Sequence, residues 1–575
     1  MPVHNSDVAD KFNRVADLLD IKGENEYRIR AYRNAAQTIS GLSRSVVESV
    51  EKGEDLSELS GIGKDLAGKI EEIVKTGELE QLRQLEREVP TGLRQLLSIE
   101  DLGPKRVKQL HEEIGIKSIE DLEKAAKAGK IQNMEGFGKK TTQKILEAID
   151  RAKKEGPKKR FRLNEAEERS LPLLDYLKKT EGVKKAEIAG SYRRRKETVG
   201  DVDILVTCKQ GTNIMDRFVN YEDVQKVISK GDTRSSIMLR NNLQVDLRVV
   251  PEVSYGAAML YFTGSKAHNV ALRKKAVEND WKMNEYGLFK GKKRIGGKTE
   301  KELYEKFGLQ YIEPELRENR GEFDAAANNE LPDLVKLKDI RGDLQSHTKA
   351  TDGKYSLEEM ATAAKEKGYD YFAITDHSKR VTVANGMDEK RLLKQLEEID
   401  RLNEKIKGFR VLKSVEVDIL KDGTLDLADE VLEKLDIVIC SIHYNFKLSR
   451  QAQTRRVLKA MEHPCFHILA HPTGRMLGKR EPYEIDLEKV IDAAKENRCY
   501  LEINAQPDRL DLNDVYAGMA KEKGVKLAIS TDAHTISDLD LMRFGVGQAR
   551  RAWLQKEDIL NTHSWEELKK MLKKK

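Results

Sequence analysis

The spacing of apolar residues divides this chain into a helical first part and a mixed remainder. From Asp7 to about Lys154, apolar residues recur at intervals of three and four, as in DVADKFNRVADLL, which predicts helices throughout. After the basic segment Lys153–Arg162, strand-like runs alternate with helical stretches. Because 575 residues are too many for one hydrophobic core, we expect about three to four domains.

Charge and cysteine usage narrow the class of protein. The net charge of +6 permits binding to nucleic acid but does not prove it. The four cysteines are widely spaced without a C-x-x-C pair, which is typical of reduced thiols in a cytosolic protein. No apolar run approaches the roughly 18 residues of a membrane span, and the N-terminus lacks the apolar segment of a secretion signal. We therefore expect a cytoplasmic monomer that does not contact a membrane.

One phrase recurs three times in the helical part, each time as a glycine turn between helices. The copies are LSGIGKDLAGKI, IEDLGPKRVKQL and MEGFGKKTTQKI, and the pattern resembles the helix-hairpin-helix motif. Glycine permits a turn that exposes backbone N–H groups at a helix start, where they bind phosphate. One copy alone could serve only for turning, whereas three copies beside cations favour contacts to DNA phosphates. The residues concerned are Gly61, Gly63, Lys64, Gly103, Lys105, Arg106, Gly136, Gly138, Lys139 and Lys140.

Two aspartates interrupt the apolar, strand-like run VGDVDILV at 199–206. Because strands alternate faces, Asp201 and Asp203 project to one side while Val202 and Ile204 face the core. For this pair alone, a solvated strand end is an alternative explanation. The later run LQVDLRVV places Asp246 on its polar side. Three carboxylates on two adjacent strands can hold two Mg²⁺ ions about 4 Å apart, so we expect a two-magnesium centre.

The sequence around these aspartates resembles one enzyme family. GSYRR at 190–194 and GDVDILV at 200–206 are similar to motifs in the α/β nucleotidyltransferase palm of family X DNA polymerases, the family of polymerase beta. The resemblance implies that Asp201 and Asp203 bind both metal ions, and that Asp246 binds only the ion that activates the primer 3′-hydroxyl. It also implies that Ser191 and Arg194 contact the triphosphate of the incoming nucleotide.

A segment resembling the thumb of the same family follows, beginning YFTGSKAHNVALR at 261–273. By this resemblance, Tyr261, Phe262 and Gly264 form the turn that packs against the sugar and rejects a 2′-hydroxyl. Asn269 matches a contact to the incoming base, and Arg273 matches a contact to the template strand. These residues are therefore expected to bind dNTPs and DNA.

The N-terminal segment resembles the small lyase domain of the family, through YRIRAYRNAAQTI at 27–39 and the first glycine phrase. In that domain a lysine forms a Schiff base with the sugar of an abasic site, and the matching position is Lys69. Arg28 replaces a family lysine, and Asp65 stands where polymerase beta has a lysine that helps to hold the 5′-phosphate. The alternative for Lys69 is a solvated helix lysine. The resemblance to the family covers about 7–318.

Histidines cluster in the last part of the chain, where seven of the eleven lie between His347 and His534. Apolar runs there repeatedly end in a side chain that can bind a metal. A βα-barrel brings the carboxyl ends of its strands to one face, so these side chains should converge. Packing does not explain five strands that end in this way, and we expect a metal centre. The candidate ligands are His347, Asp352, His377, Glu416, His443, His471, Asp532 and His534.

This arrangement resembles the PHP (polymerase and histidinol phosphatase) domain, a distorted (βα)7 barrel that holds up to three ions of Mn²⁺, Zn²⁺ or Fe. The family usually begins H-x-H, whereas this chain has Gln345 two residues before His347. Because glutamine is a poor ligand for such metals, one ion is expected to bind weakly or not at all, unless Asp343 compensates. The resemblance implies 3′–5′ exonuclease activity and processing of abasic or blocked 3′ ends.

Together these features predict a repair polymerase that fills short gaps and carries a metal-dependent 3′ nuclease. Its expected partners are gapped or primer-template DNA and dNTPs. One alternative is a DNA-end-binding polymerase whose barrel is a scaffold, which Gln345 favours; another is a barrel that hydrolyses small phosphate esters. The expected domains are a helical lyase-like DNA-binding domain (1–85), fingers with helix-hairpin-helix motifs (86–155), a palm (156–252), a thumb (253–318), a linker (319–338) and a PHP domain (339–575).

Overall fold

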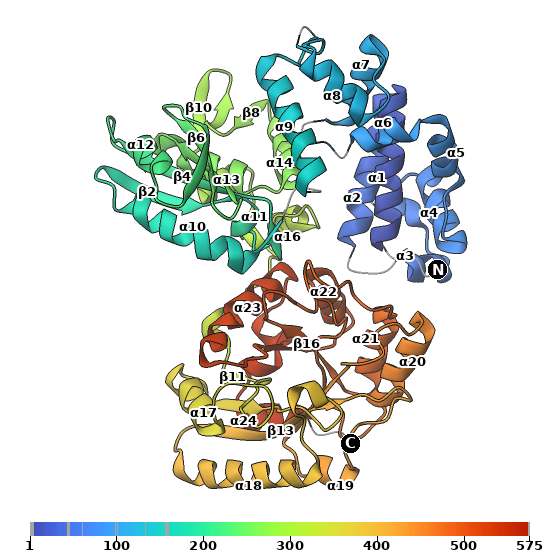
Figure 1. The fold of residues 1–575 in the computed structure, drawn as a ribbon, viewed down its shortest axis with the longest axis vertical. Helices are drawn as coiled ribbons and strands as arrows, with labels where there is room; N and C mark the ends of the chain where they lie inside the picture. Colours follow the sequence, from blue (N-terminus) through green and yellow to red (C-terminus); the bar gives the residue numbers. More distant parts are fainter. Residues whose placement is uncertain are drawn as a thin grey trace. The chain divides into compact units, whose positions relative to one another are not determined.

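The computed structural model describes residues 5–42, 46–59, 61–97, 99, 102–132, 134–155 and 160–572. The chain divides into two compact units, 1–160 and 161–575 (Figure 1). Among the helices described, none combines the length and the apolar composition that a bilayer span requires.

The first unit is helical, as the apolar spacing predicts. Its described residues pack around one continuous core that includes Phe12 and Phe137, so the two helical domains expected at 1–85 and 86–155 share that core. The ring of Phe12 meets that of Tyr32 edge to face, with centroids 5.3 Å apart. The helices are α1 (Asn5–Lys22), α2 (Glu26–Gly41), α3 (Val46–Glu51), α4 (Lys64–Thr76), α5 (Glu80–Glu88), α6 (Thr91–Leu96), α7 (Pro104–Ile114), α8 (Ile119–Lys127) and α9 (Lys139–Glu155).

The second unit begins with a mixed sheet, which we call the palm (161–250). The strand order is β2-β4-β7-β6-β5, with β4 and β7 parallel and the other neighbours antiparallel. The elements are β1 (Phe161–Arg162), α10 (Leu163–Lys178), β2 (Val183–Ile188), α11 (Gly190–Arg193), β3 (Thr198–Val199), β4 (Asp201–Cys208), α12 (Ile214–Val219), β5 (Val224–Ser229), β6 (Arg234–Leu239) and β7 (Gln244–Val249).

Residues 251–334 form the next region, which we call the thumb. The segment expected to be a linker at 319–338 is not one: its helix α16 places Phe323 and Ala326 in the thumb core. The helix is too short for its apolar spacing to stand out in the sequence. The thumb elements are α13 (Tyr255–Thr263), α14 (Lys266–Glu278), β8 (Trp281–Asn284), β9 (Gly287–Lys290), β10 (Lys293–Gly296), α15 (Glu300–Lys306) and α16 (Glu322–Asn328).

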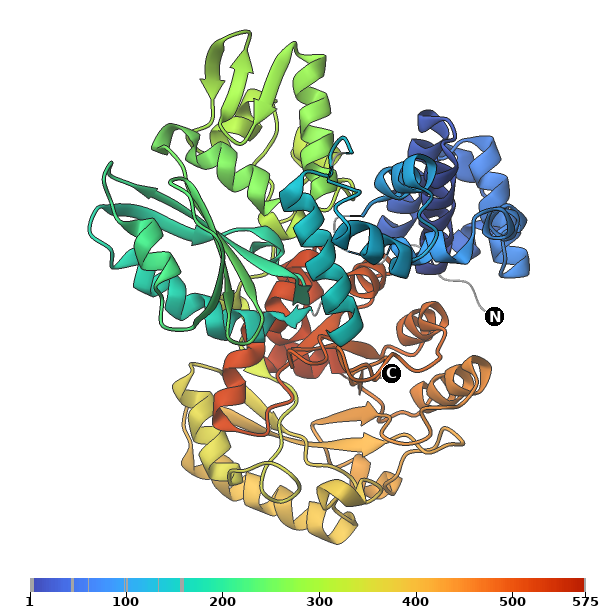
Figure 2. The ribbon, with the colours of Figure 1, turned by 45° about the horizontal axis from the view of Figure 1, so that its top comes forward.

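Residues 335–572 form a seven-stranded parallel barrel in the order β11 to β17 (Figure 2). A parallel bridge between Ser346 and Ala533, which follow the first and last strands, nearly closes it. Its strands are buried apolar runs, as expected for strands covered on both faces. The predicted barrel is confirmed. The strands are β11 (Gly342–Asp343), β12 (Tyr371–Ile374), β13 (Arg410–Asp418), β14 (Ile437–Ser441), β15 (Ile468–Leu469), β16 (Tyr500–Asn504) and β17 (Leu527–Ser530).

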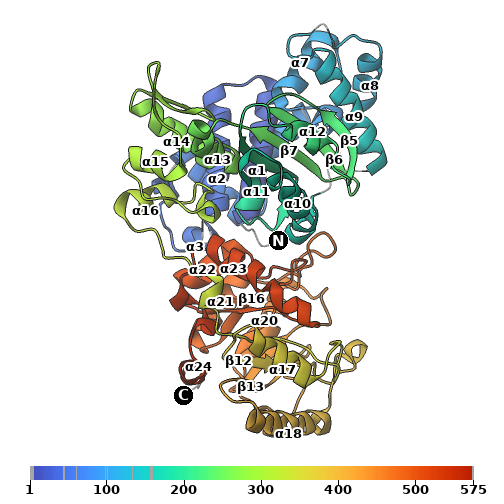
Figure 3. The same ribbon diagram turned by 90° about the vertical axis from the view of Figure 1, so that its left-hand side faces the viewer.

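Helices surround the barrel, and two of them, α22 and α23, lie at the end that meets the palm and thumb (Figure 3). Phe544 of α23 and Leu510 belong to the palm core, while Trp553 packs on the thumb core. The second unit is thus held together by apolar packing as well as by ion pairs. The helices are α17 (Leu357–Glu366), α18 (Glu389–Lys405), α19 (Asp429–Leu432), α20 (Arg450–Met461), α21 (Leu487–Glu496), α22 (Asp514–Glu522), α23 (Met542–Arg551) and α24 (Trp565–Leu572).

Candidate active sites in the palm and the barrel

The three palm aspartates lie on the neighbouring parallel strands β4 and β7. The register pairs Asp203 directly with Asp246, and Asp201 lies two residues earlier on the same face as Asp203. Val202 and Ile204 are buried on the opposite face, as the alternation predicts. The structure therefore brings the three predicted carboxylates together on one face of the palm sheet.

Two nearby arginines, Arg234 and Arg248, compensate the charges of these aspartates only in part. Burial, and then the neighbouring Asp201 and Asp246, raise the pKa of Asp203 to about 7 against the effect of these arginines. Among the described residues, the hydrogen bonds that Asp246 accepts are long, from Gln244 Nε2 at 3.3 Å and Arg234 Nη2 at 3.5 Å. A group of partly buried carboxylates that keeps this much mutual repulsion fits divalent cations such as Mg²⁺.

The turn that carries Ser191 lies beside the aspartates. Gly190 has a φ of +67°, and a Cβ there would lie 3.1 Å from Asp203 Oδ2. Glycine therefore allows the backbone of this turn to approach the carboxylate closely. Ser191 is on α11, and Arg194 follows directly after this helix.

The turn at Gly264, which the sequence predicts to bind the nucleotide, lies against Arg194. Its Nη1 donates to the carbonyl of Thr263, and a Cβ on Gly264 would lie 3.0 Å from that nitrogen. Tyr261 and Phe262 meet edge to face at 5.0 Å, and Asn269 Nδ2 donates to the Tyr261 carbonyl at 2.6 Å. The structure therefore places Arg194 against the turn at Thr263 and Gly264, and Asn269 against the backbone of Tyr261.

Arg273 lies one helical turn after Asn269, and its Nε donates to the Asn269 carbonyl at 3.3 Å. Arg273, the predicted template contact, and Asn269, the predicted base contact, thus lie on the same helix, α14.

The glycine phrases of the first unit begin helices, as predicted. Gly63 and Gly103 are the N-caps of α4 and α7 without a side-chain cap. The first N–H groups of α4 therefore have no side-chain partner at the cap, whereas α7 begins with Pro104, which has no N–H. A Cβ on Gly63, Gly103 or Gly138 would meet no atom within 4 Å. Packing inside the chain does not require glycine at these positions, whereas a closely approaching DNA backbone would.

The cations beside these turns differ in their surroundings. Lys64 and Lys139 are exposed, while Lys105 forms an exposed ion pair with Glu26 at 2.5 Å. The guanidinium of Arg106 lies 5.6 Å from the centroid of the Phe137 ring. The Lys140 side chain lies outside the described residues.

Lys69, the predicted Schiff-base residue, is on α4 with its side chain 17% exposed. Its ammonium pairs with Asp65, one turn earlier, and lies 5.9 Å from the centroid of the Tyr32 ring. Any covalent chemistry at Lys69 therefore requires its release from Asp65.

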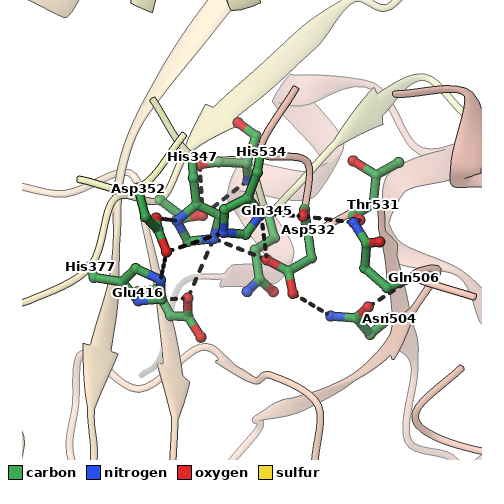
Figure 4. A network of polar contacts seen from close by, with 12 residues as sticks. Gln345, His347, Asp352, His377, Glu416, Asn504, Gln506, Thr531, Asp532 and His534 are labelled. Atoms are coloured by element: carbon green, nitrogen blue, oxygen red, sulfur yellow. Dashed lines mark hydrogen bonds and ion pairs between the residues drawn. The ribbon is translucent and has the colours of Figure 1, made fainter. Parts of the chain in front are cut away.

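The ligands predicted in the barrel converge at the carboxyl ends of its strands (Figure 4). Glu416 lies at the centre, with its oxygens 3.2 Å from His377 Nδ1, 3.5 Å from His443 Nε2 and 3.0 Å from His471 Nε2. His347 Nε2 lies 3.0 Å from Asp532 Oδ1. Three groups of facing ligand atoms result: His347, Asp352, His377 and His534; His377, Glu416 and His443; and His347, Glu416 and Asp532.

The geometry of this cluster fits bound metal ions better than a hydrogen-bond network. The Nδ1 atoms of His347 and His377 are buried and make no hydrogen bond, although they lie 3.7 and 3.2 Å from carboxylate oxygens. Nitrogen and oxygen atoms that face one another in this way are placed to share a cation, and this donor set suits Mn²⁺ or Zn²⁺. Asp352 and His534 are about one-third exposed and form the open side of the cluster.

The ionisation of the cluster reflects its mixed charges. Burial alone would lower the pKa of His377, but Glu416 and Asp352 outweigh it and raise this pKa to about 9. Burial would raise the pKa of Glu416, but His377, His443 and His471 hold it well below its usual value. The Glu416 carboxylate is therefore ionised at neutral pH, as a metal ligand must be.

Gln345 and Asp343 behave differently from the predicted ligands. Gln345 is buried with neither amide atom hydrogen-bonded. The Asp343 carboxylate accepts hydrogen bonds from the Thr531 backbone and hydroxyl, and burial raises its pKa to about 6. Asp343 belongs to none of the three ligand groups, and its compensation for Gln345 stays a prediction.

Sequence reasoning missed two residues of β16 that support the cluster. Glu502 Oε2 accepts from the backbone N–H of His471 at 2.7 Å, and burial together with Asp532 raises the pKa of Glu502 well above its usual value. Asn504 Nδ2 donates to Asp532 Oδ2 at 3.0 Å. The signal was present, because YLEIN is another apolar run that ends in polar side chains.

Comparisons with family models cover most of both units. A helix-hairpin-helix domain matches 3–79, and a SAM-like helix-hairpin-helix tandem matches 93–151. The DNA polymerase beta palm matches 163–261, the DNA polymerase beta thumb matches 258–318, and the PHP domain matches 343–506.

Curated relatives match either the whole chain or its barrel. The DNA polymerase/3′-5′ exonuclease PolX of Bacillus subtilis (strain 168) is 38% identical, over 100% of both chains. A probable phosphatase of Thermoanaerobacter sp. (strain X514) is 32% identical over 38% of this chain and 89% of its own length. Another, from Acetivibrio thermocellus, is 29% identical over 38% of this chain and 86% of its own. The chain therefore belongs to the family X DNA polymerases that carry a C-terminal PHP domain, enzymes that combine a DNA polymerase with a 3′–5′ exonuclease.

Proposed function

We propose that this enzyme fills short gaps during base excision repair and uses its barrel to trim or unblock the 3′ end of the primer. The observation that carries the polymerase part is the register of β4 and β7, which sets Asp203 beside Asp246 with Asp201 on the same face. A reduced, cytoplasmic setting is part of the proposal, and the wide spacing of the four cysteines in the sequence, without a C-x-x-C pair, supports it.

In the palm, Mg²⁺ ions would stabilise the charge that develops on the attacking and leaving oxygens. The contribution of the chain is to hold the ligands in place: Asp201 and Asp203 for both ions, and Asp246 for the one nearer the primer 3′-hydroxyl. The turn at Gly190 keeps Ser191 next to these carboxylates, where it can bind the triphosphate. Asn269 and the aromatic pair of α13 are placed to hold the base and the sugar.

DNA binding in this proposal uses the helix starts of the first unit. The N–H groups that follow Gly63 and Gly138 would bind phosphates of gapped or primer-template DNA without reading sequence, and after Gly103 this role would begin at Lys105 because Pro104 has no N–H. The nearby lysines would add electrostatic affinity, which should fall with salt concentration.

Lys69 is the proposed nucleophile for removal of a 5′ sugar phosphate. Borohydride reduction should trap the wild-type chain on DNA with an incised abasic site, and Lys69→Ala should not be trapped. Lys75→Ala is the matched control, because Lys75 also pairs with a carboxylate one turn earlier on α4, at 2.8 Å. Equal trapping of the two variants would remove Lys69 from this role.

In the barrel, Mn²⁺ or Zn²⁺ ions would supply a hydroxide for attack on a phosphodiester. His347, His377 and Glu416 would hold the ions from inside, and the more exposed Asp352 and His534 border the opening through which a DNA end could enter. A second candidate function is hydrolysis of small phosphate esters, which the resemblance of the barrel to probable phosphatases favours.

One set of assays separates these activities. Digestion of a 5′-labelled primer in Mn²⁺ should be lost in a His443→Ala, Asp532→Ala double variant, with gap filling kept. His463→Ala is the control, because this histidine pairs with Asp429 outside the cluster. Hydrolysis of p-nitrophenyl phosphate without primer digestion would favour the phosphatase. If the wild-type chain performs neither reaction but extends primers, the barrel is a scaffold.

Asp246→Ala tests the palm independently. This variant should bind gapped DNA normally but fail to extend it, because it lacks one metal ligand. Extension at the wild-type rate would overturn the assignment of the palm carboxylates.

A further inference from the structure

The palm loop between α11 and β3 is held by side chains of the barrel. This loop, residues 194–197, connects the turn beside the active-site aspartates to the strands that carry them. Glu197 accepts hydrogen bonds from Arg475 at 2.5 Å and from Gln548 of α23 at 3.0 Å. Both partners lie more than 270 residues further along the chain. The conformation of the loop therefore depends on the barrel.

The middle of the loop is strained and is also supported by the barrel. Arg195 has a φ of +56°, a conformation that residues other than glycine seldom adopt. A Cβ on Gly547 of α23 would lie 3.4 Å from the Cβ and Cγ of Arg195, so the missing side chain lets Arg195 rest against the helix. A strained backbone persists only where its neighbours fix it.

Arg551, the last residue of α23, connects three parts of the second unit. Its guanidinium, with the side chain 1% exposed, donates from Nη1 to the Arg194 carbonyl at 2.8 Å and to Glu318 Oε1 at 3.0 Å. Its Nη2 donates to Asp514 Oδ2 at 2.6 Å. The palm loop, the end of the thumb and the barrel thus meet at one buried side chain.

Glu318 connects Arg551 to Arg194, the proposed triphosphate contact. The oxygen that Arg551 binds also accepts from Arg194 Nε, at 3.1 Å. Burial would raise the pKa of Glu318, but Arg551 and Arg194 lower it to about 2, so the carboxylate stays ionised. Arg551 consequently fixes Arg194 twice, by its carbonyl and through the Glu318 carboxylate that orients its guanidinium.

We propose that Arg551 of the PHP barrel is a positioning residue for DNA synthesis, setting the affinity of the palm for the incoming nucleotide by fixing the Arg194 loop. The inference rests on the proposed role of Arg194 as a triphosphate contact. It assigns the barrel a part in polymerisation that is separate from its metal centre.

The test measures dNTP dependence with the full chain on one-nucleotide-gap DNA at saturating DNA and Mg²⁺. Arg551→Gln should raise the KM for the complementary dNTP by about ten-fold, within the range typical of coupling between sites, while kcat changes much less. Arg550→Gln is the matched control. Arg550 lies on the same helix, but among the described residues its side chain contacts Glu315 at 2.8 Å, Glu313 and the Val335 carbonyl rather than the loop. This control should keep the wild-type KM.

Gln548→Leu provides a second variant should Arg551→Gln fail to fold. It removes only the hydrogen bond to Glu197, and should raise the same KM by a smaller factor. An unchanged KM in both folded variants, or an equal rise in Arg550→Gln, would overturn the inference.

Arg194→Gln separates this outcome from failure of the proposed function. If Arg194→Gln binds nucleotide as the wild type does, the triphosphate assignment is wrong. If Arg194→Gln raises KM while the Arg551 and Gln548 variants do not, the assignment stands and the role of the barrel falls.

Discussion

Replacing Glu318 with glutamine should make the second unit less sensitive to acid. Glu318 is largely buried, and its arginine partners lower its pKa from 4.5 to about 2. A carboxyl whose pKa is depressed by folding stabilises the folded state above its unfolded pKa and loses that contribution as pH falls towards its folded pKa. The stabilisation by Glu318 is therefore complete at neutral pH and declines between about pH 4.5 and pH 2.

The size of the effect follows from the two pKa values. At about 1.4 kcal/mol for each pH unit, a shift from 4.5 to about 2 corresponds to about 3 kcal/mol at neutral pH. At pH 3 the linkage relation leaves about 1 kcal/mol, so about 2 kcal/mol is lost on acidification from pH 7. Glu318→Gln cannot titrate, and its free energy of unfolding should fall by about 2 kcal/mol less over the same interval.

Tryptophan fluorescence isolates the relevant unit, because all three tryptophans, Trp281, Trp553 and Trp565, lie in the second one. Urea unfolding at pH 7 and at pH 3 would give the change in the free energy of unfolding with pH for the wild type and for the variant. The glutamine variant will also be less stable at pH 7, since Arg551 loses a charged partner, so the comparison concerns the change with pH. Glu305→Gln, at an exposed pair with Lys301, is the control. Parallel pH dependence of Glu318→Gln and the wild type would refute the reasoning.

Three further predictions concern buried contacts. Phe544→Ala should lower the unfolding free energy of the second unit by about 3–5 kcal/mol in the same fluorescence assay, because the 3%-exposed ring fills the palm core. Glu300→Gln should lower the free energy of unfolding of the second unit by about 3–5 kcal/mol, because it weakens the pairing of the fully buried guanidinium of Arg317. Stability equal to that of the wild type would contradict this prediction. Gln345→His should increase the Mn²⁺ retained per chain after gel filtration, measured by elemental analysis, because it replaces two unpaired amide atoms with a metal ligand; unchanged content would show that the position does not bind metal.

Site residues can be predicted from the sequence where the geometry of a single strand or of a parallel sheet determines the direction of their side chains. The alternation of a strand placed Asp201 and Asp203 on one face, and the structure adds the register with Asp246. In the same way, parallel strands all point one way, so side chains at their ends converge, as Glu416 and its histidines do. In both cases the local pattern determines the direction of the side chain.

Contacts between distant segments of the chain leave no such pattern in the sequence. Arg551 and Arg194 are 357 residues apart, and neither stands in a motif that would predict their hydrogen bond. The helix of residues 322–328 spans fewer than two turns, which is too short for its apolar spacing to distinguish it from a linker. Glu502 lies in a run that resembles the other strand ends, but no histidine beside it marks the run as a metal-binding segment.

The barrel, the palm and the thumb are therefore one compact unit, whatever chemistry the barrel performs. The palm and thumb matches end at residue 318, yet the palm core includes Leu510 and Phe544, and the thumb core is packed against by Trp553. A chain cut after residue 318 would expose these apolar surfaces to water and leave Arg194 without Arg551 and its second link through Glu318. The palm thus requires the barrel for packing even if the barrel has no nuclease activity. The presence of the barrel is therefore not by itself proof of catalysis there. The metal ligands have to be tested separately from α23, which the variants at His443 and Arg551 accomplish.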